Sequence, residues 1–436
     1  MAKLHLITYG CQMNEYDSER VAGLLGRERY ELTDREDEAD LILINTCAIR
    51  EKAEEKVFSR LGQLKGLKQK NPGLIIGVMG CMAQLQQRDI LKRAPVVDLV
   101  FGSPAMSRVG ELVERVKRER RPVLETGEHP LTKITSTLSR PDRLKAFVTV
   151  MEGCDKYCTF CVVPYTRGRE RSHAPESILE EIRGLAQQGY REVTLLGQNV
   201  NAYGKDLTPA ADLAALIESV NQIEGIERIR FTTSNPVNLT RRLIRALRDV
   251  PKACEYLHLP LQSGSDRVLA RMNRGYTRAR YLELIAELQE TVPGIALSTD
   301  LIVGFPGETE ADFEATVEMV ERVGYDSLFA FRYSRRPRTP AAEFPDQVPE
   351  ADKARRLTRL LEVANAIQAR KNAALEGREM EVLVDGVSKK DPRELAGRTR
   401  CNRAVNFDGG GRRLYGELVP VRITQAMPHS LRGALA

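Results

Sequence analysis

Three cysteines stand within eight residues of one another, at Cys154, Cys158 and Cys161. Thiolate sulfur is a ligand for soft metal centres, namely iron–sulfur clusters, zinc and copper(I). Three thiols are one ligand short of a four-thiolate cage, and a four-iron cluster held in this way keeps one iron open for a substrate or cofactor. A zinc site completed by a distant histidine is the alternative, although the nearest histidine is His173. The spacing therefore favours an iron–sulfur site with an open coordination position.

A second set of cysteines is scattered along the first 81 residues. Cys11, Cys47 and Cys81 each follow a short apolar run, at residues 4–9, 41–45 and 74–79. The carboxyl ends of buried parallel strands meet at one edge of a sheet, so we expect the three thiols to converge and to hold a second cluster. The alternative is three unrelated buried thiols, because free cysteine is often buried for packing alone. Cys254 and Cys401 have no such partners, and we expect both to be structural.

The elements that would position the second set alternate between strand and helix. Amphipathic helical patterns at residues 17–27 and 51–65 follow the first two apolar runs. This alternation predicts a doubly wound parallel sheet over residues 1–118. A stretch rich in Pro, Gly, Ser and Thr then predicts a linker over residues 119–139.

A second series of strand and helix patterns surrounds the first three cysteines. Strands are predicted at residues 147–151, 192–196, 229–233, 256–259, 296–303 and 327–333, with helical patterns such as 175–188 and 281–291 between them. Six such units fit an incomplete TIM-like (βα)6 barrel over residues 140–370. Barrel enzymes place their chemistry at the carboxyl ends of the strands, which is where Cys154 and its neighbours fall.

Other polar and glycine-rich segments follow later strands of the predicted barrel. They contain Gly197, Gln198 and Asn199 after the second strand, Ser263 and Ser265 after the fourth, and Gly304 and Gly307 after the fifth. Taken alone each glycine indicates a turn, but their shared position at strand ends suggests a ligand. Arg167, Arg169 and Arg171 follow the cysteine run and could contact phosphates, or could form a solvated basic turn.

The C-terminal region changes to an alternating pattern. A charged helix at residues 350–375 precedes strand patterns at 379–384, 397–406 and 414–423, with Gly409, Gly410 and Gly411 predicted to form a hairpin turn. This predicts a small antiparallel β-barrel over residues 373–436. From residue 371 onward there are 12 Lys and Arg against 8 Asp and Glu, so +4 of the net charge of +6 lies here. A polyanionic partner is indicated, contacted by Arg398, Arg400 and Arg403, with a merely solvated face as the alternative.

Length and composition limit the class of protein. The 436 residues suggest roughly three domains, and 42% hydrophobic with 29% charged residues describe a folded chain with sizeable cores. Without an apolar run of 18 residues or a hydrophobic signal core, we expect neither membrane insertion nor secretion and predict a cytoplasmic protein. Eight cysteines in that compartment favour metal binding over disulfides.

The cysteine run at the head of a six-strand barrel resembles the radical S-adenosylmethionine superfamily. The resemblance implies that the open iron binds S-adenosylmethionine, whose reductive cleavage gives a 5′-deoxyadenosyl radical. It also implies contacts to this cofactor from Gly197, Gln198, Asn199, Ser263, Ser265, Gly304 and Gly307.

The whole chain resembles the methylthiotransferase family, whose C-terminal barrel is called a TRAM domain. Residues 8–19, 151–170 and 196–204 are similar to the tRNA-modifying members. The resemblance implies transfer of a methylthio group to carbon 2 of N(6)-isopentenyladenosine at position 37 of tRNA, beside the anticodon. It further implies two 4Fe-4S clusters, two S-adenosylmethionine molecules per turnover, and an electron donor of flavodoxin or ferredoxin type. We expect a monomer.

The resemblance leaves two alternative functions open, and the sequence differs from the family pattern at one position. The acceptor could instead be threonylcarbamoyl-adenosine in tRNA or a ribosomal-protein aspartate. The chain could also be a non-catalytic RNA-binding iron–sulfur sensor, although such a sensor has no need of the segments at the strand ends. Asn235 stands where this family branch is expected to have histidine, which weakens any role assigned to that strand end.

Overall fold

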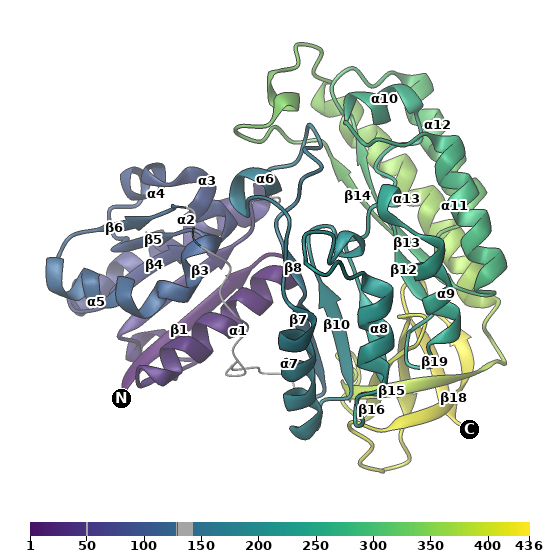
Figure 1. Cartoon of the computed structure of the whole chain (residues 1–436), viewed down its shortest axis with the longest axis horizontal. Helices are drawn as coiled ribbons and strands as arrows, with labels where there is room; N and C mark the ends of the chain where they lie inside the picture. The colour runs from purple at the N-terminus through teal and green to yellow at the C-terminus, as the bar shows by residue number, and fades with distance from the viewer. Residues whose placement is uncertain (49–50, 128, 130–142) are drawn as a thin grey trace.

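The computed structural model describes residues 1–48, 51–127, 129 and 143–436, arranged as three domains (Figure 1). The N-terminal domain is a six-stranded parallel sheet in the order β2-β1-β3-β4-β5-β6. Its strands are β1 (Ala2–Tyr9), β2 (Tyr30–Leu32), β3 (Leu41–Thr46), β4 (Ile75–Met79), β5 (Leu99–Phe101) and β6 (Val123–Glu125). Its helices are α1 (Gln12–Arg27), α2 (Glu51–Lys70), α3 (Cys81–Gln86), α4 (Arg88–Arg93) and α5 (Val109–Glu119).

Helices cover both faces of this sheet, which confirms the doubly wound prediction. Val21 and Leu25 of α1 pack with α5 in one hydrophobic cluster, whereas Leu61 and Leu64 of α2 pack with α3 and α4 in another. The strand order reverses between β1 and β3, and such a switch point is where open α/β sheets bind ligands. Strands β5 and β6 were not predicted because three residues are too few to show a pattern. The predicted linker at residues 119–139 begins too early, because β6 lies within it and pairs with β5, whereas residues 128 and 130–139 lie outside the described residues.

The middle domain contains two three-stranded parallel sheets, β11-β10-β7 and β12-β13-β14. They meet where the Ile229 amide donates to the Lys252 carbonyl at 2.8 Å, so the six strands follow chain order as an incomplete barrel. The strands are β7 (Lys145–Thr149), β10 (Glu192–Leu196), β11 (Arg228–Phe231), β12 (Tyr256–His258), β13 (Ala296–Val303) and β14 (Ser327–Arg332). This confirms the predicted barrel, with β7 and β14 at its two open edges.

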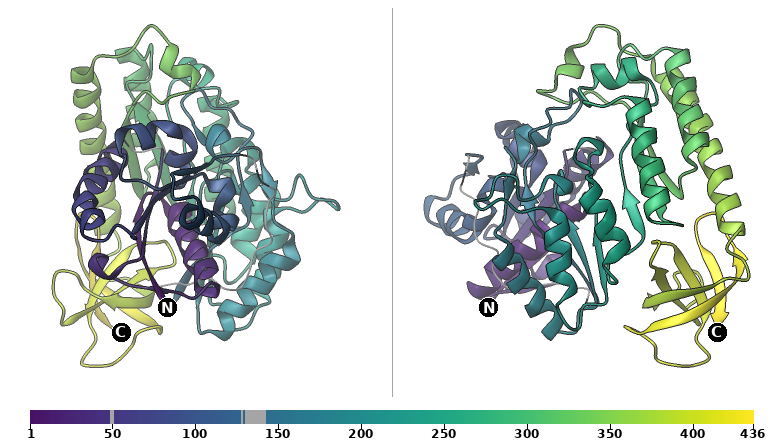
Figure 2. Two further views of the ribbon diagram at one scale, coloured as in Figure 1. Left: turned by 90° about the vertical axis from the view of Figure 1, so that its left-hand side faces the viewer. Right: turned by 45° about the vertical axis from the view of Figure 1, so that its right-hand side comes forward.

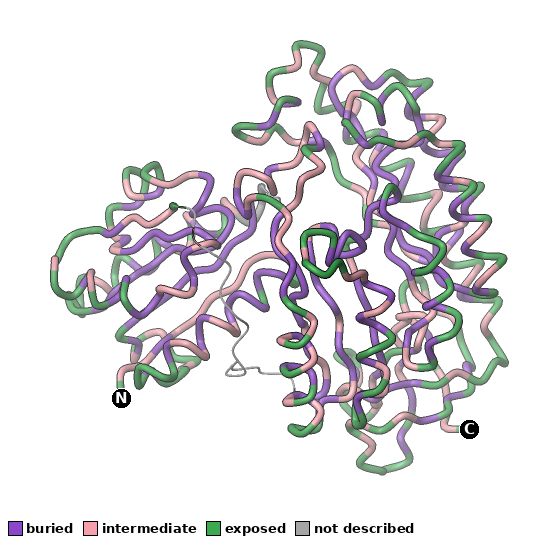
Figure 3. Tube along the Cα trace, viewed as in Figure 1, coloured by how far each residue is buried: buried purple, intermediate pink, exposed green. Residues whose placement is uncertain are grey.

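Helices on the outside of the barrel bury its core, and Figure 3 shows helices with exposed outer faces around strands that are mostly buried, with β14 as the exception. These helices are α7 (Pro175–Gln187), α8 (Leu213–Asn221), α9 (Arg241–Asp249), α11 (Arg278–Thr291), α12 (Glu310–Val323) and α13 (Glu350–Ala373), whereas Val268 of α10 (Asp266–Arg271) packs with Phe305 in a separate cluster. The first predicted strand is split into β7 and a two-residue strand, β8 (Met151–Glu152), which pairs with β9 (Arg171–Ser172). A short helix, α6 (Val163–Thr166), follows the cysteine run.

The C-terminal domain is a closed barrel in the order β15-β16-β17-β19-β18. Its strands are β15 (Glu379–Val387), β16 (Glu394–Thr399), β17 (Ala404–Asp408), β18 (Leu418–Ala426) and β19 (Leu431–Leu435). The small barrel is as predicted, and its pairings are antiparallel except for β17 with β19.

Two details of this barrel were predicted wrongly. Residues 397–406 are not one strand, because the chain turns between β16 and β17, with Asn402 in the left-handed region at φ 65°. Asparagine tolerates that conformation and favours a turn there. The three glycines do not form a hairpin either, because β17 pairs with β16 and β19 whereas β18 pairs with β15 and β19.

The domains are arranged around the barrel. The N-terminal domain lies beside β7, and the C-terminal domain lies beneath the barrel at the amino ends of its strands (Figures 1 and 2). Arg228, which is fully buried, donates to the carbonyl of Arg398 at 2.6 Å, and Arg230 donates to the carbonyls of Thr399 and Arg400 at 2.8 Å. The turn between β16 and β17 is therefore docked on the barrel floor. Among the described residues, no helix has the length and apolar character needed to span a membrane.

Candidate active site

Three adjacent strands bring the N-terminal cysteines to one edge of the sheet. In the β1, β3 and β4 register, Tyr9 pairs with Thr46 and Asn45 pairs with Met79, and each cysteine follows within two residues. Cys11 is the N-cap residue of α1, Cys47 directly follows β3, and Cys81 is the first residue of α3. Neighbouring strands are about 4.8 Å apart, so the three thiols converge at the switch point of the sheet.

Electrostatic contacts show how close these thiols lie. A hydrogen bond with the Cys47 thiol lowers the pKa of Cys11 to about 6, against the effect of burial, and the Arg167 guanidinium adds to the lowering. Arg167 also interacts electrostatically with Cys81. The neighbouring domain's Arg167 thus acts on two of the three thiols, and at Cys11 the environment favours thiolate, the form that binds metal.

Two buried asparagines support this edge, and sequence reasoning missed both. The Asn14 side chain donates to the Asn45 side chain at 3.0 Å, and the Asn45 amide donates back to the Asn14 carbonyl at 2.8 Å. The Asn14 side-chain oxygen also accepts from the Cys11 amide at 3.3 Å. A Cβ on Gly80 would lie 2.3 Å from the Asn45 side chain, so only glycine fits before Cys81. An asparagine within three residues of Cys11 and of Cys47 was the available signal.

The other three cysteines lie on the loop after β8, at the carboxyl end of the barrel. The Cys161 amide donates to the Cys158 carbonyl at 2.9 Å, and Tyr157 takes a left-handed conformation at φ 47° that bends the loop. Burial raises the pKa of Cys154 to about 11 and that of Cys161 to about 12. Thiolates here therefore need the positive charge of bound metal.

The donor set fits a cluster better than a single ion. Within the described residues, no three His, Cys, Asp or Glu side chains are gathered closely enough to ligate one ion. The thiols around a four-iron cluster each bind a different iron and are spaced more widely than the ligands of one zinc ion. Three cysteines on one loop are a ligand set that such a cluster takes, whereas zinc would need a fourth ligand from elsewhere in the chain.

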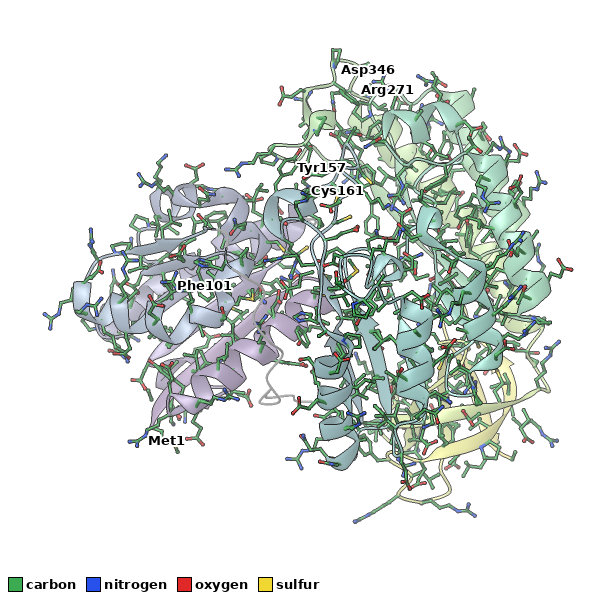
Figure 4. The ribbon with its side chains drawn as sticks, viewed as in Figure 1. Met1, Phe101, Tyr157, Cys161, Arg271 and Asp346 are labelled. Carbon is green, nitrogen blue, oxygen red and sulfur yellow. The ribbon has the colours of Figure 1, made fainter. Side chains whose placement is uncertain are left out.

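A segment distant in sequence holds this loop, and no sequence pattern indicated the contact. Thr159 donates to the Arg271 carbonyl at 2.8 Å, and Asn273 donates to the carbonyls of Lys156 and Tyr157. Buried Arg274 donates to the Cys158 sulfur at 3.1 Å. Figure 4 shows Tyr157 and Cys161 above the barrel, on the side turned towards the N-terminal domain.

The two sets of cysteines face the same domain boundary. Arg167, just after α6, donates to Asp17 of α1 at 2.5 Å, and both side chains are buried. Cys81 packs in a hydrophobic cluster with Val162, the residue after Cys161. Each set therefore lies beside the contact between the N-terminal domain and the barrel.

Two of the residues expected to bind S-adenosylmethionine keep buried polar atoms without a partner. The Gln198 side-chain oxygen accepts from the Gly153 amide, whereas its nitrogen is unpaired. Asn199 donates to Glu170 at 2.7 Å, whereas its oxygen is unpaired. Such orphaned atoms are costly unless a ligand pairs with them. Gly197 lies against Met151, where a Cβ would come within 2.5 Å of that side chain.

The other expected contacts are engaged in local structure. Ser265 caps α10 and donates to Asp312 at 2.5 Å, and the Ser263 hydroxyl accepts from the Ser265 amide at 3.3 Å. The Gly304 amide donates to the Glu308 side chain at 2.8 Å, and the Gly307 amide donates to the Asp346 carbonyl at 2.7 Å. Arg271 and Asp346 form an ion pair in this region, at the top of Figure 4.

Asn235, which stands where histidine is expected in this family branch, has a structural role. Its side-chain oxygen accepts from the Val237 amide at 3.0 Å, and its own amide donates to the Asn201 side chain at 2.9 Å. Asn235 therefore closes the turn after β11 and fixes the segment beside Asn199.

Several arginines do not behave as predicted. Arg167 is buried in its ion pair, so it cannot meet a phosphate, whereas Arg169 remains 82% exposed in its side chain. Arg400 pairs with Glu255 at 2.8 Å and Arg403 pairs with Asp326, so both attach the C-terminal barrel to the middle domain. The prediction that these two contact a polyanion is wrong, because their charges are already neutralised. Arg398 donates to the Asn402 carbonyl at 3.0 Å.

Comparison with known proteins defines the class first. Three family models match the chain: the uncharacterized protein family UPF0004 over residues 3–102, the radical SAM superfamily over 148–320, and the TRAM domain over 373–436. The fold is similar to the radical S-adenosylmethionine methyltransferase TsrM from Kitasatospora setae, with a TM-score of 0.60 and 13% identity over 78% of this chain and 75% of that one. The cobalamin-dependent radical enzyme OxsB aligns with a TM-score of 0.55 and 14% identity over 84% and 58% of the two chains.

The full-length relatives then define the family. A protein of Clostridium botulinum named tRNA-2-methylthio-N(6)-dimethylallyladenosine synthase is 51% identical over 98% of this chain and 95% of its own. A protein of the same name from Moorella thermoacetica is 50% identical over 99% and 97%. The chain belongs to this family of radical S-adenosylmethionine tRNA methylthiotransferases, and the radical SAM domain implies a 4Fe-4S cluster and S-adenosylmethionine.

Proposed function

We propose that this enzyme adds a methylthio group to carbon 2 of N(6)-isopentenyladenosine, also called N(6)-dimethylallyladenosine, at position 37 of tRNA. The relatives that match nearly the whole chain carry the name of this synthase. The observation that carries the proposal is the placement of two cysteine sets beside one domain boundary, joined by the buried Arg167–Asp17 pair. A sulfur source and a radical source must both reach one carbon atom, and this arrangement brings them together.

The six cysteines are assigned as two groups of ligands. Cys154, Cys158 and Cys161 would hold the cluster of the radical SAM domain, and Cys11, Cys47 and Cys81 would hold a second 4Fe-4S cluster. When bound, the cluster of the radical SAM domain would supply the electron that cleaves S-adenosylmethionine. The second cluster would supply an open iron that holds sulfur. We assign residues 1–118, extended to β6 at Glu125, to the domain of the second cluster, 140–370 to the radical core and 373–436 to the RNA-binding domain.

The protein's own residues orient these groups. Arg274 donates to the Cys158 sulfur and Arg167 acts on Cys11 and Cys81, so each set has a buried cation that stabilises thiolate charge. The unpaired nitrogen of Gln198 and the unpaired oxygen of Asn199 are the groups we assign to S-adenosylmethionine. We also assign to S-adenosylmethionine binding the backbone of Gly197, Gly304 and Gly307 and the segment that contains Ser263 and Ser265.

The tRNA contact is assigned to the end of the C-terminal barrel opposite the docked turn between β16 and β17. Glu394 pairs with Asp408, so the loop before β16 and the loop after β17 lie at the same end. Exposed basic residues occur on both loops: Lys389, Lys390, Arg412 and Arg413. Phosphate contacts from these residues would make binding sensitive to salt. An electron donor of flavodoxin or ferredoxin type and a monomeric state complete the proposal.

The test is to supply the anaerobically reconstituted enzyme with each acceptor and to identify the methylthio product by mass. The acceptors are a tRNA containing dimethylallyladenosine, a tRNA containing threonylcarbamoyl-adenosine, and the ribosomal protein with its aspartate. We expect product on the dimethylallyladenosine tRNA. Product only on another acceptor would overturn the substrate assignment, and absence of 5′-deoxyadenosine release under strong reductant would favour the sensor.

A further inference from the structure

One face of the sheet formed by β12, β13 and β14 carries aromatic side chains that are exposed to solvent. Phe329 and Phe331 on β14 are 52% and 42% exposed. In the register Asp300 pairs with Phe329 and Ile302 pairs with Phe331, so these four side chains lie on the same face. Ser298 and His258 continue that face on the neighbouring strand positions.

This face is turned away from the outer helices. Leu297, Leu301 and Val303 alternate with the residues above and belong to the cluster that the helices bury, and Leu328 and Ala330 pack against the same cluster. Phe329 and Phe331 must therefore point to the inner side of the barrel. Exposed phenylalanines on the inner face of an enzyme barrel indicate a surface that a ligand covers.

A polar edge borders the aromatic rings. The His258 ring lies against the Phe329 ring edge-to-face, with centroids 6.2 Å apart. His258 Nδ1 is 2.8 Å from the Ser298 hydroxyl and Nε2 is 3.3 Å from the Asp300 carboxylate. The Asp300 side chain remains 32% exposed, so its carboxylate can still accept a hydrogen bond from a ligand.

The same face leads to the radical loop. Ile302 and Phe160, which stands between Cys158 and Cys161, both pack against one hydrophobic cluster. Phe331 pairs with Ile302, and Phe329 lies one row, about 7 Å, further from that loop. The aromatic surface thus begins beside the radical loop and extends down the inner wall.

We infer that Phe329 and Phe331 receive the dimethylallyl-substituted adenine of the substrate, with Asp300 at its polar edge. The inference rests on the proposed function and adds the residues that select the substrate. An adenine base stacks on aromatic rings, and its branched five-carbon group is apolar, so both parts match this surface. The N6–H is a donor that the Asp300 carboxylate can accept.

The test compares two anticodon stem–loop RNAs, one with dimethylallyladenosine and one with unmodified adenosine, by their dissociation constants for the reconstituted enzyme. We expect the wild type to bind the modified RNA about 10-fold more tightly, because a hydrophobic pocket discriminates small apolar groups by factors of this order. Phe329→Ala is expected to reduce that ratio to about 2-fold, because the lost ring weakens stacking of the base in both RNAs but contact with the apolar five-carbon group only in the modified RNA. Asp300→Asn should weaken binding of the modified RNA by a smaller factor.

Controls separate this inference from other outcomes. Leu32→Ala, which truncates an exposed side chain of the N-terminal domain, should keep the full ratio. Phe329→Leu keeps an apolar side chain in case Phe329→Ala does not fold, and it should lose part of the ratio. The inference would be overturned if both Phe329 variants kept the wild-type ratio of dissociation constants for the two RNAs. It would also be overturned if the variants bound S-adenosylmethionine more weakly while their RNA selectivity stayed unchanged. Wild-type product on the modified RNA tests the proposed function separately, so the two failures are distinguishable.

Discussion

The two cysteine sets reach the same domain boundary by different routes. Cys154, Cys158 and Cys161 lie on one loop, and their spacing alone indicates a metal site. Cys11, Cys47 and Cys81 are separated by 36 and 34 residues and meet only because β1, β3 and β4 are adjacent and parallel. A contiguous set is built by local chain geometry, whereas a scattered set depends on the whole sheet. Cluster binding by Cys11, Cys47 and Cys81 should therefore be more sensitive to changes in the packing around them than cluster binding by the contiguous set.

The largest expected effect comes from the contiguous set. Cys154→Ala removes a ligand of the radical cluster, so both 5′-deoxyadenosine release and methylthiolation should fall by about 1000-fold or more, as when a group essential to the chemistry is removed. Chromatographic quantitation of 5′-deoxyadenosine and of the modified nucleoside measures both. Cys401→Ser is the matched control and should retain both activities. Product formation by Cys154→Ala would contradict its role.

Loss of a scattered cysteine should separate the two activities. Cys47→Ala should abolish methylthiolation while S-adenosylmethionine cleavage continues within a few-fold of wild type, because the radical loop keeps its ligands. The ratio of 5′-deoxyadenosine to methylthio product, measured in the same reaction, reports this directly. If both activities disappear together, the two sets do not act as separate sites.

The buried pair between the domains should affect stability strongly. Asp17→Asn leaves Arg167 buried without its anion, which costs about 3–5 kcal/mol for a buried ion pair. Denaturant unfolding of the N-terminal transition measures this loss. Asp37→Asn, which breaks an exposed ion pair with Arg35, should leave the transition unchanged. If the two variants had equal free energies of unfolding, the Arg167–Asp17 contact would not hold the domains together.

Arg274 should tune the radical cluster. Arg274→Gln removes a cation that donates to the Cys158 sulfur, so the reduced, more negative cluster loses stabilisation and its midpoint potential should fall. A shift of about 60 mV corresponds to about 1.4 kcal/mol for one electron. Potentiometric titration followed by electron paramagnetic resonance measures it, with Arg280→Gln on the exposed side of α11 as control. If the wild type and Arg274→Gln had equal midpoint potentials, Arg274 would have only a packing role.

The smallest effect distinguishes two groups of arginines on the C-terminal barrel. Replacing Arg412 and Arg413 with glutamine should reduce the salt dependence of tRNA binding, by about 0.7 to 0.9 in the log–log slope for each phosphate that is no longer neutralised. Arg400→Gln should lower thermal stability and leave that slope unchanged, because its partner is Glu255. Filter binding of tRNA at several salt concentrations measures the slope. The reverse pattern would place the RNA on the docked side of the barrel.

The sequence predicted the strands of the barrel closely, because buried apolar runs alternate there with amphipathic helices. The strand patterns at 192–196 and 296–303 coincide with β10 and β13. It also predicted convergence of the scattered cysteines, since each follows a strand of a parallel sheet. The failures came from contacts between distant segments. No local pattern shows that Arg400 pairs with Glu255 or that Arg274 reaches Cys158.

The most direct test of two separate cluster sites is the iron and sulfide content after anaerobic reconstitution. Wild type should contain about eight irons per chain, as expected for two four-iron clusters. Replacing Cys154, Cys158 and Cys161 together with alanine should leave about four irons, and so should replacing Cys11, Cys47 and Cys81. About four irons in the wild type, with none left in one of the triple variants, would contradict the account.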